Sequence, residues 1–199
     1  MKKLLVIFTC FFSASAVIAQ TSFSNGSVEL SQKASGAGTT VTSKGSSSSF
    51  SFRFKTKAVQ IIDKSGFLSV DSQVVQIALL DPIDPKKRLD SLNESEQKSF
   101  LSQYSKYELE YFKELGIEVI RPHNQWEPVG GRKWFIWYFG VGKTPVKTEQ
   151  QVKIQLFASA IVGKRVLTLN APISDVDNFE KAAKIINEVM ETLLVIKKG

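Results

Sequence analysis

The stretch GRKWFIWYFGVG, residues 131–142, places six consecutive apolar side chains, residues 134–139, between a basic pair and a glycine. In an extended strand, side chains alternate between the two faces of a sheet, so Trp134 and Trp137 point to opposite faces. Neither face of such a strand suits contact with water. We therefore expect a central strand that is covered on both sides.

Other apolar runs predict the remaining strands. Phe50, Phe52 and Phe54 alternate with polar residues, which is typical of a strand with one face in water. Residues 74–80 form an apolar run that ends at the proline-rich stretch 81–85, for which we expect a loop. The patterns also predict a short strand over residues 117–121 and a hairpin made of residues 150–161 and 165–170.

Two amphipathic helices are predicted. The first begins near Ser91, has acidic residues in its first turns and ends at Gly116. The second follows Ser174 and Asp177, which resemble a capping box, and it keeps apolar residues at helical spacing. Residues 194–196 are either its last turn or a short closing strand.

Strands in runs, with one helix between them and one at the end, predict an α+β fold: a mostly antiparallel sheet with helices packed on it. We assign it to one domain over residues 50–199. Between residues 31 and 49, thirteen of nineteen residues are Ser, Thr or Gly, which offer little apolar surface to bury. We therefore expect a mobile loop or arm there, and we assign residues 20–49 to a Ser/Gly/Thr-rich N-terminal arm.

The N-terminus has the pattern of a secretory signal peptide. Two lysines precede an apolar run and a group of small residues, and Val17 and Ala19 suit the cleavage subsites. We expect residues 1–19 to be removed and Gln20 to begin the mature chain. The run is too short for a membrane span, and too little apolar sequence precedes Cys10 for a lipoprotein site. The protein is therefore expected to be exported, either periplasmic or secreted.

The mature chain has a modest positive charge and no cysteine. Removal of residues 1–19 leaves 24 Lys and Arg against 19 Asp and Glu, a net charge of about +5, and a single histidine. Stability must then come from a core and not from disulfides. The cations are scattered along the chain, so solubility explains them better than binding to nucleic acid.

The C-terminal part resembles the PsbP-like family, which includes bacterial DcrB-type envelope proteins. The resemblance covers roughly residues 117–196 and rests on the aromatic strand, a hairpin that ends in RVLTLNAPISD, and the helix NFEKAAKIINEVMETL. It implies an α/β/α sandwich that is usually non-enzymatic and serves as a binding or accessory module. It carries over no catalytic residue.

No residue pattern indicates a catalytic, metal or cofactor site. His123 is the only histidine, and no nucleophile-elbow pattern accompanies it. Zinc is unexpected, because the mature chain has no cysteine to accompany that one imidazole. The spacing of Asp81, Asp84, Asp90 and Glu94 does not match a calcium-binding loop. The glycine pair ahead of the aromatic strand precedes a strand and not a helix, so a hairpin turn is expected there and not a phosphate cradle.

The segment RPHNQWEPVGGRK, residues 121–133, is the best candidate for a recognition site. We expect residues 122–131 to form a loop beside the aromatic strand, with Arg121, His123, Trp126 and Arg132 as binding residues. Tryptophan and arginine often anchor protein interfaces. The alternative is that Trp126 folds back and caps the core.

These observations indicate an exported, non-catalytic binding or accessory protein of the bacterial cell envelope. Its partner is an envelope protein or a small ligand. Two alternatives stay open: a hydrolase with a carboxylate-based site, and a carrier of small hydrophobic ligands that uses the aromatic strand. Paired carboxylates with shifted pKa values would favour the hydrolase, and an apolar cavity beside Trp137 would favour the carrier.

Overall fold

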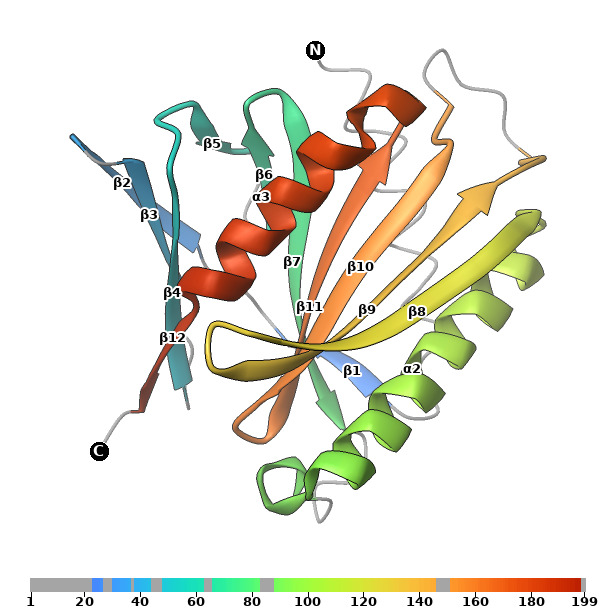
Figure 1. Cartoon of the computed structure of the whole chain (residues 1–199), viewed down its shortest axis with the longest axis horizontal. Coiled ribbons are helices and arrows are strands. Elements are labelled where there is room, and N and C mark those ends of the chain that lie inside the picture. The colour runs from blue at the N-terminus through green and yellow to red at the C-terminus, as the bar shows by residue number, and fades with distance from the viewer. Residues whose placement is uncertain are drawn as a thin grey trace.

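The computed structural model describes residues 23–26, 30–36, 38–43, 48–62, 66–82, 88–145 and 151–197. The predicted signal peptide, its cleavage site and Cys10 lie outside these residues. Within them, the chain forms two antiparallel sheets and two α-helices (Figure 1). The predicted α+β fold is confirmed.

In the described part of the chain, the larger sheet has eight antiparallel strands. The long strands lie together at its centre and at one edge, and β1 pairs with the second half of β7. The strand order is β5 (Val59–Ile61), β6 (Phe67–Val70), β7 (Gln73–Pro82), β11 (Arg165–Ile173), β10 (Ile154–Val162), β9 (Arg132–Val141) and β8 (Val119–Val129), with β1 (Phe23–Gly26) beside β7. The predicted hairpin is β10–β11. The loop predicted over residues 81–85 is wrong at its start, because Asp81 and Pro82 pair with β1.

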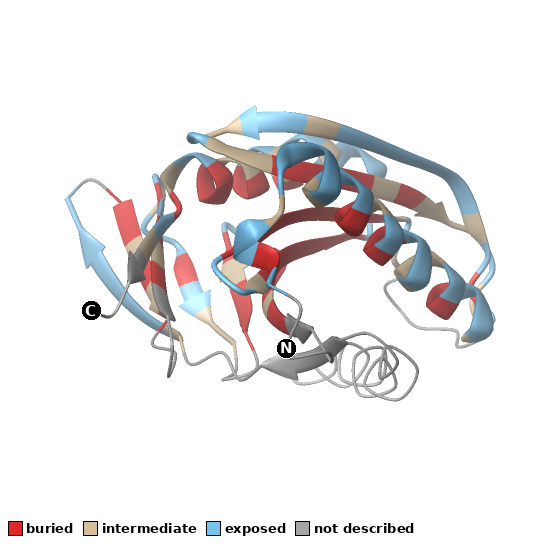
Figure 2. Cartoon of the chain, turned by 90° about the horizontal axis from the view of Figure 1, so that it is seen from below, coloured by how far each residue is buried: buried red, intermediate tan, exposed pale blue. Residues whose placement is uncertain are grey.

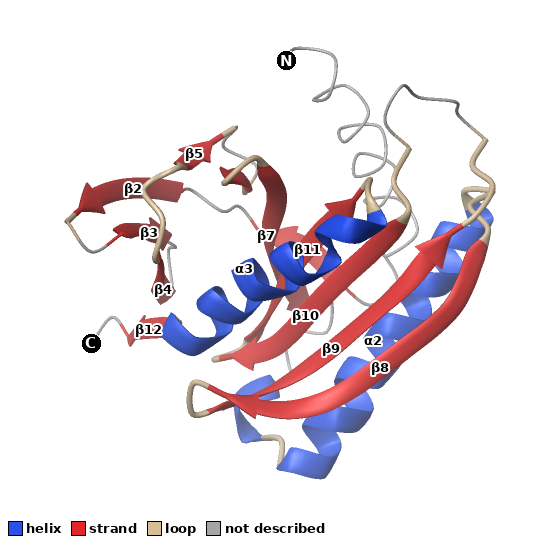
Figure 3. Cartoon of the chain, turned by 45° about the horizontal axis from the view of Figure 1, so that its top comes forward, coloured by secondary structure: helices blue, strands red, loops and turns tan. Residues whose placement is uncertain are grey.

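One helix covers each face of the larger sheet (Figure 3). α2 (Glu94–Glu114) packs on β8, β9 and β10, and its inner side is buried while its outer side is exposed (Figure 2). Asn93 and Glu96 form a capping box at its start. α3 (Phe179–Thr192) packs on the other face, over β7, β10 and β11.

The predicted capping box at Ser174 is wrong. The side chain of Asp175 accepts the hydrogen bond from the Asp177 backbone, and a short 3-10 helix, η3 (Val176–Asn178), precedes α3. Asn178 is the N-cap residue of α3 and makes no side-chain capping bond. Asp177 is too short to act as the Glu of a capping box, so the chain uses an Asp175 turn in its place.

The aromatic strand β9 is buried on both faces, as its sequence predicts. Trp134 belongs to the cluster of core residues under α3, and Trp137 to the cluster under α2. Trp134 is 0% exposed and Trp137 is 2% exposed. The six apolar side chains therefore serve two separate layers of core.

A second, four-stranded sheet contains the segment predicted to be a loop or arm. Its order is β12 (Leu194–Lys197), β4 (Ser48–Phe54), β3 (Gly38–Ser43) and β2 (Leu30–Ser35). The loop prediction is wrong for β2 and β3. Thr39, Val41 and Ser43 alternate as buried residues, and β-branched threonine favours strands even where a composition rich in small polar residues suggests a loop.

The second sheet shares a core with α3. Phe50, Phe52 and Phe54 of β4 are buried in the same cluster as the inner face of α3, which confirms the predicted half-buried strand. The side chain of Gln32 bonds to the backbone of Val59 and Ile61, which ties β2 to β5. Residues 194–196 take the second predicted form, a closing strand.

Candidate functional site

The segment predicted to be a loop is most of the first strand of a long hairpin, together with the hairpin turn. β8 continues to Val129 and pairs with β9 up to Arg132, so the predicted loop over residues 122–131 is wrong. Gly130 and Gly131 form the two-residue turn with φ of 59° and 73°, as a turn of the type I′ class requires. A Cβ on Gly130 would lie 2.4 Å from the backbone oxygen of Met190, so only glycine fits. The glycine pair is a hairpin turn, as predicted.

An irregularity interrupts β8 near its start. The register shifts between Ile120 and His123, and Arg121 has a φ of 46°. Such a bulge increases the local twist and changes the direction of the side chains that follow. The polar composition suggested a loop because the strand lies at the edge of the sheet and most of its side chains are exposed.

Strand alternation separates the predicted binding residues. His123 lies opposite Tyr138 on the face that α3 covers, while Trp126 lies opposite Phe135 on the face that α2 covers. The ring of His123 is 5.1 Å from that of Tyr138, which in turn is 5.4 Å from Phe179. His123 is exposed, so one side of its ring faces water.

Trp126 is half-buried and packs on the core beneath the first turn of α2. Its ring centre is 6.5 Å from that of Phe135, and its Nε1 donates a hydrogen bond to Glu94 Oε1 at 3.1 Å. Lys133 Nζ lies 3.1 Å from the same oxygen. The bond from Trp126, and then that from Lys133, lowers the pKa of Glu94. The geometry is that of the alternative prediction, a tryptophan that caps the core.

The two arginines lie at opposite ends of the hairpin. Arg121 is exposed at the bulge, whereas Arg132 is half-buried beside the turn, with its Nη1 3.5 Å from the Ile161 backbone oxygen. Burial lowers the pKa of Arg132. The structure therefore does not bring Arg121, His123, Trp126 and Arg132 into one cluster.

Sequence reasoning missed a polar network under α2. The hydroxyl of Tyr104 forms hydrogen bonds with the Glu108 carboxyl and the Thr168 hydroxyl. Thr168 and Ser159, on neighbouring strands, have their hydroxyl oxygens 3.1 Å apart. Burial raises the pKa of Glu108 to about 7, although the bond from Tyr104 opposes this shift. The same burial, followed by the charge of Glu108, raises the pKa of Tyr104.

Three buried carboxamides lie on the same face as this network. Gln76 is paired across the strands with Asn170, and Gln155 lies diagonally from Asn170 on the next strand. The side-chain oxygens of all three are buried without a hydrogen-bond partner in the structure. A signal was present in the sequence, because amide side chains interrupt largely apolar strands at these positions.

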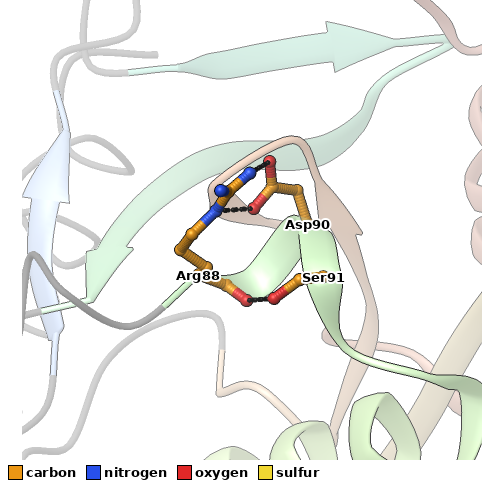
Figure 4. Close-up of polar contacts among 3 residues, drawn as sticks. All are labelled: Arg88, Asp90 and Ser91. Atoms are coloured by element: carbon orange, nitrogen blue, oxygen red, sulfur yellow. Dashed lines mark hydrogen bonds and ion pairs between the residues drawn. The ribbon is translucent and has the colours of Figure 1, made fainter.

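The acidic residues considered for calcium do not form a cluster where they are described. Asp90 Oδ2 pairs with Arg88 Nη2 at 3.2 Å, and Ser91 Oγ donates to the Arg88 backbone oxygen (Figure 4). Arg88, first by its hydrogen bonds, lowers the pKa of Asp90. Among the described residues, no three His, Cys, Asp or Glu side chains are grouped to hold a metal ion.

Two observations bear on the alternative functions. Three carboxyls have shifted pKa values, and none of them has another carboxyl as its principal partner. Asp90 bonds to Arg88, Glu94 to Trp126 and Lys133, and Glu108 to Tyr104. The rings of Trp137 and Phe157 are stacked at 3.9 Å with an angle of 4° between them. That side of Trp137 is filled by protein.

Comparisons with sequence families and with curated proteins give no match. A comparison with solved structures finds the solution structure of cyanobacterial PsbP (CyanoP) from Synechocystis sp. PCC 6803. The similarity covers 86% of this chain and 95% of that one, with a TM-score of 0.46 and 12% sequence identity. The matched structure is that of a PsbP protein, from the family that residues 117–196 resemble in sequence pattern.

Proposed function

We propose that the protein is an exported, non-catalytic binding protein of the bacterial cell envelope, and that β8 is the surface that engages a partner protein. The observation that carries this proposal is the exposed edge of a long strand. Within the described residues, β8 pairs only with β9, and most of its eleven residues are exposed. Figure 2 shows the strand coloured mainly as exposed. An unpaired edge is a ready template for an extended segment of another chain.

The backbone of β8 limits how a partner can pair with it. Val129 and Arg132 close a two-residue turn, so the backbone groups of Val129 and of every second residue before it face β9. Those of Asn124, Trp126 and Pro128 then face outward. Pro128 has no N–H, as is usual for a proline on an edge strand. Two outward N–H groups therefore remain in this part of β8. They can form hydrogen bonds with a short extended segment of a partner, but they offer little for continued strand addition and aggregation.

The exposed side chains give this edge its chemical character. Arg121 and His123 stand at one end of β8, and Gln125 and Glu127 follow on the same face as His123. Trp126 is fixed on the other face by Glu94 and supports the strand. A rigid hairpin that carries polar side chains suits selective binding of a polar peptide segment.

Export is part of the proposal and rests on the N-terminal sequence. Residues 1–19 combine two lysines, an apolar run and small residues at the cleavage subsites. No helix in the described part of the chain is long and apolar enough to cross a membrane. Intact mass of the protein recovered from outside the cytoplasm should correspond to a chain that begins at Gln20. A lipid adduct on Cys10 would contradict this.

Site-specific photo-crosslinking tests the binding surface. We expect a photoreactive side chain at Gln125 to form a protein adduct in the cell envelope, whereas the same group at Glu110, exposed on the outer side of α2, should not. Asn124→Pro removes an outward N–H and should reduce the Gln125 adduct at least about fivefold without loss of folding. Equal adducts at both positions, or no effect of Asn124→Pro, would contradict the proposal.

A further inference from the structure

The α2 side of the larger sheet contains a polar patch, which we call the carboxamide face: Gln76 of β7, Asn170 of β11 and Gln155 of β10. The three residues are 5%, 2% and 8% exposed. Each has a buried side-chain oxygen that finds no donor in the structure. A buried polar group without a partner is costly, so three adjacent cases on one face call for an explanation.

The carboxyl of Glu108 borders this face. Tyr104 reaches Thr168 of β11, and Phe112 contacts Phe157 of β10. Glu108 lies between them on the inner side of α2 and so faces the junction of β10 and β11. Asn170 and Phe157 are direct neighbours at that junction.

Uncharged groups surround the carboxyl. Besides Tyr104, the inner side of α2 places Ser105, Tyr111 and Phe112 nearest to Glu108. The described strand residues on the same side of β6, β7, β10 and β11 have no charge and are, in chain order, Phe67, Ser69, Val74, Gln76, Ala78, Leu80, Gln155, Phe157, Ser159, Ile161, Val166, Thr168, Asn170 and Pro172. The same side of β9 has Phe135, Trp137 and Phe139, and its Lys133 pairs with Glu94 in the first turn of α2. The patch therefore combines three amide oxygens, one carboxyl and aromatic rings, without a described cation.

We propose that the carboxamide face, with Glu108 at its border, binds a small organic amine. The N–H groups of an amine supply the donors that the three amide oxygens lack, and Glu108 balances the positive charge. Phe157 lies in the same row as Gln76 and Asn170, and although one face of its ring is stacked on Trp137, its apolar edge suits the carbon chain of such a ligand. The protein itself has a positive net charge, so nonspecific attraction does not favour such a ligand. This site is separate from β8 and is independent of the proposed partner.

A matched pair of compounds tests the ligand class. The exported protein is titrated calorimetrically with 1,4-diaminobutane and with 1,4-butanediol, which has the same length but no charge. We expect saturable 1:1 binding of the diamine and no comparable binding of the diol. Absence of saturable diamine binding, or equal binding of both compounds, would overturn the proposal.

Dependence on pH tests the part of Glu108. With a pKa of about 7, its ionised fraction rises from about one tenth at pH 6 to about nine tenths at pH 8, while an alkyl ammonium stays protonated. Diamine association should strengthen about five- to tenfold over this range. Glu108→Gln should abolish the pH dependence, and the exposed control Glu110→Gln should keep it. A pH dependence unchanged in Glu108→Gln would overturn the assignment.

Substitutions in the carboxamide face complete the test. Gln76→Met and Gln155→Met preserve side-chain length but remove the oxygen, and each should weaken diamine association at least about fivefold. Far-UV circular dichroism checks that the variants fold. In the unsubstituted protein, the side-chain amide resonances of Gln76, Gln155 and Asn170 should shift on addition of the diamine. Unshifted resonances, or unchanged affinity in both folded variants, would rule out this face as the site.

Discussion

The two faces of the central strands β7, β11 and β10 differ in whether their buried side chains include polar atoms without hydrogen-bond partners. On the α3 side, Ile77, Leu169 and Ala158 form an aliphatic row across the strands. The next row, on the α2 side, contains Gln76, Asn170 and Phe157. The two rows differ by one residue along each strand, yet one is wholly apolar and the other contains buried oxygens without donors. The α3 side has the composition of a core, whereas the α2 side retains groups suited to a ligand.

A buried amide on the α3 side sharpens this contrast. Gln73 lies on the same strand as Gln76 and is also buried, but its Nε2 donates to the backbone oxygens of Val74 and Pro172. The fold can therefore provide hydrogen-bond partners for a buried glutamine on β7 where that glutamine has a structural role. That Gln76 is not satisfied in this way supports a role other than stability for the carboxamide face.

The largest expected effect tests whether the aromatic part of the α2 side is core. Trp137→Ala should lower the free energy of unfolding by about 3–5 kcal/mol, because it removes a buried ring stacked on Phe157 and leaves a cavity. Chemical denaturation measures the change. A loss below about 1 kcal/mol would mean that this part of the α2 side is not packed as a core. The contrast between core and ligand-binding groups would then not hold within the α2 side.

The polar network should make stability depend on pH. Because burial raises the pKa of Glu108 from 4.5 to about 7, the folded protein holds this proton more tightly than the unfolded chain. The resulting stabilisation is complete below about pH 4.5 and is lost as pH rises through about 7, by at most about 3 kcal/mol. Glu108→Gln should flatten the decline between pH 5 and 8, and Glu110→Gln should not. A decline unchanged in Glu108→Gln would place its cause elsewhere.

The sequence predicts those parts of the fold that depend on strong periodicity. The apolar run of β9 and the stripe of α3 specify a strand covered on both faces and a helix, and the structure has both. The small, polar residues of β2 and β3 carry no such signal, so strand pairing with β4 decides their structure. The sequence of β8 predicts a loop where the structure has a strand, because an edge strand can be as polar as a loop.

The candidate site was harder to predict than the fold. Arg121, His123, Trp126 and Arg132 are close in sequence, but strand alternation sends His123 and Trp126 to opposite faces. Conversely, Glu108 and Asn170 are distant in sequence, and only the packing of α2 on the sheet brings them to the same side. Proximity along the chain is a poor guide to proximity in space when the segment is extended.

Two glutamines on β7 allow a direct comparison of an amide that has hydrogen-bond partners with an amide whose oxygen has none. Gln76→Met removes an oxygen without a donor and should raise the free energy of unfolding by about 1 kcal/mol. Gln73→Met removes a paired donor and should lower it by about 1–2 kcal/mol. Thermal or chemical unfolding measures both. Opposite signs support the contrast between the faces, and equal losses would argue that Gln76 is also structural.

The smallest expected effect concerns Trp126, at the border where α2 meets the edge strand. Trp126→Phe retains a ring against Phe135 but removes the N–H that bonds to Glu94. Because that bond is the main cause of the lowered pKa of Glu94, the pKa should rise toward its ordinary value, with Lys133 still holding it partly down. Carboxyl titration by NMR measures this shift, and the melting temperature should change little. A large fall in melting temperature would show that the indole is needed for packing. An unchanged Glu94 pKa would show that the bond does not persist in solution, and Trp126 would then be free to serve as the recognition anchor that the sequence suggests.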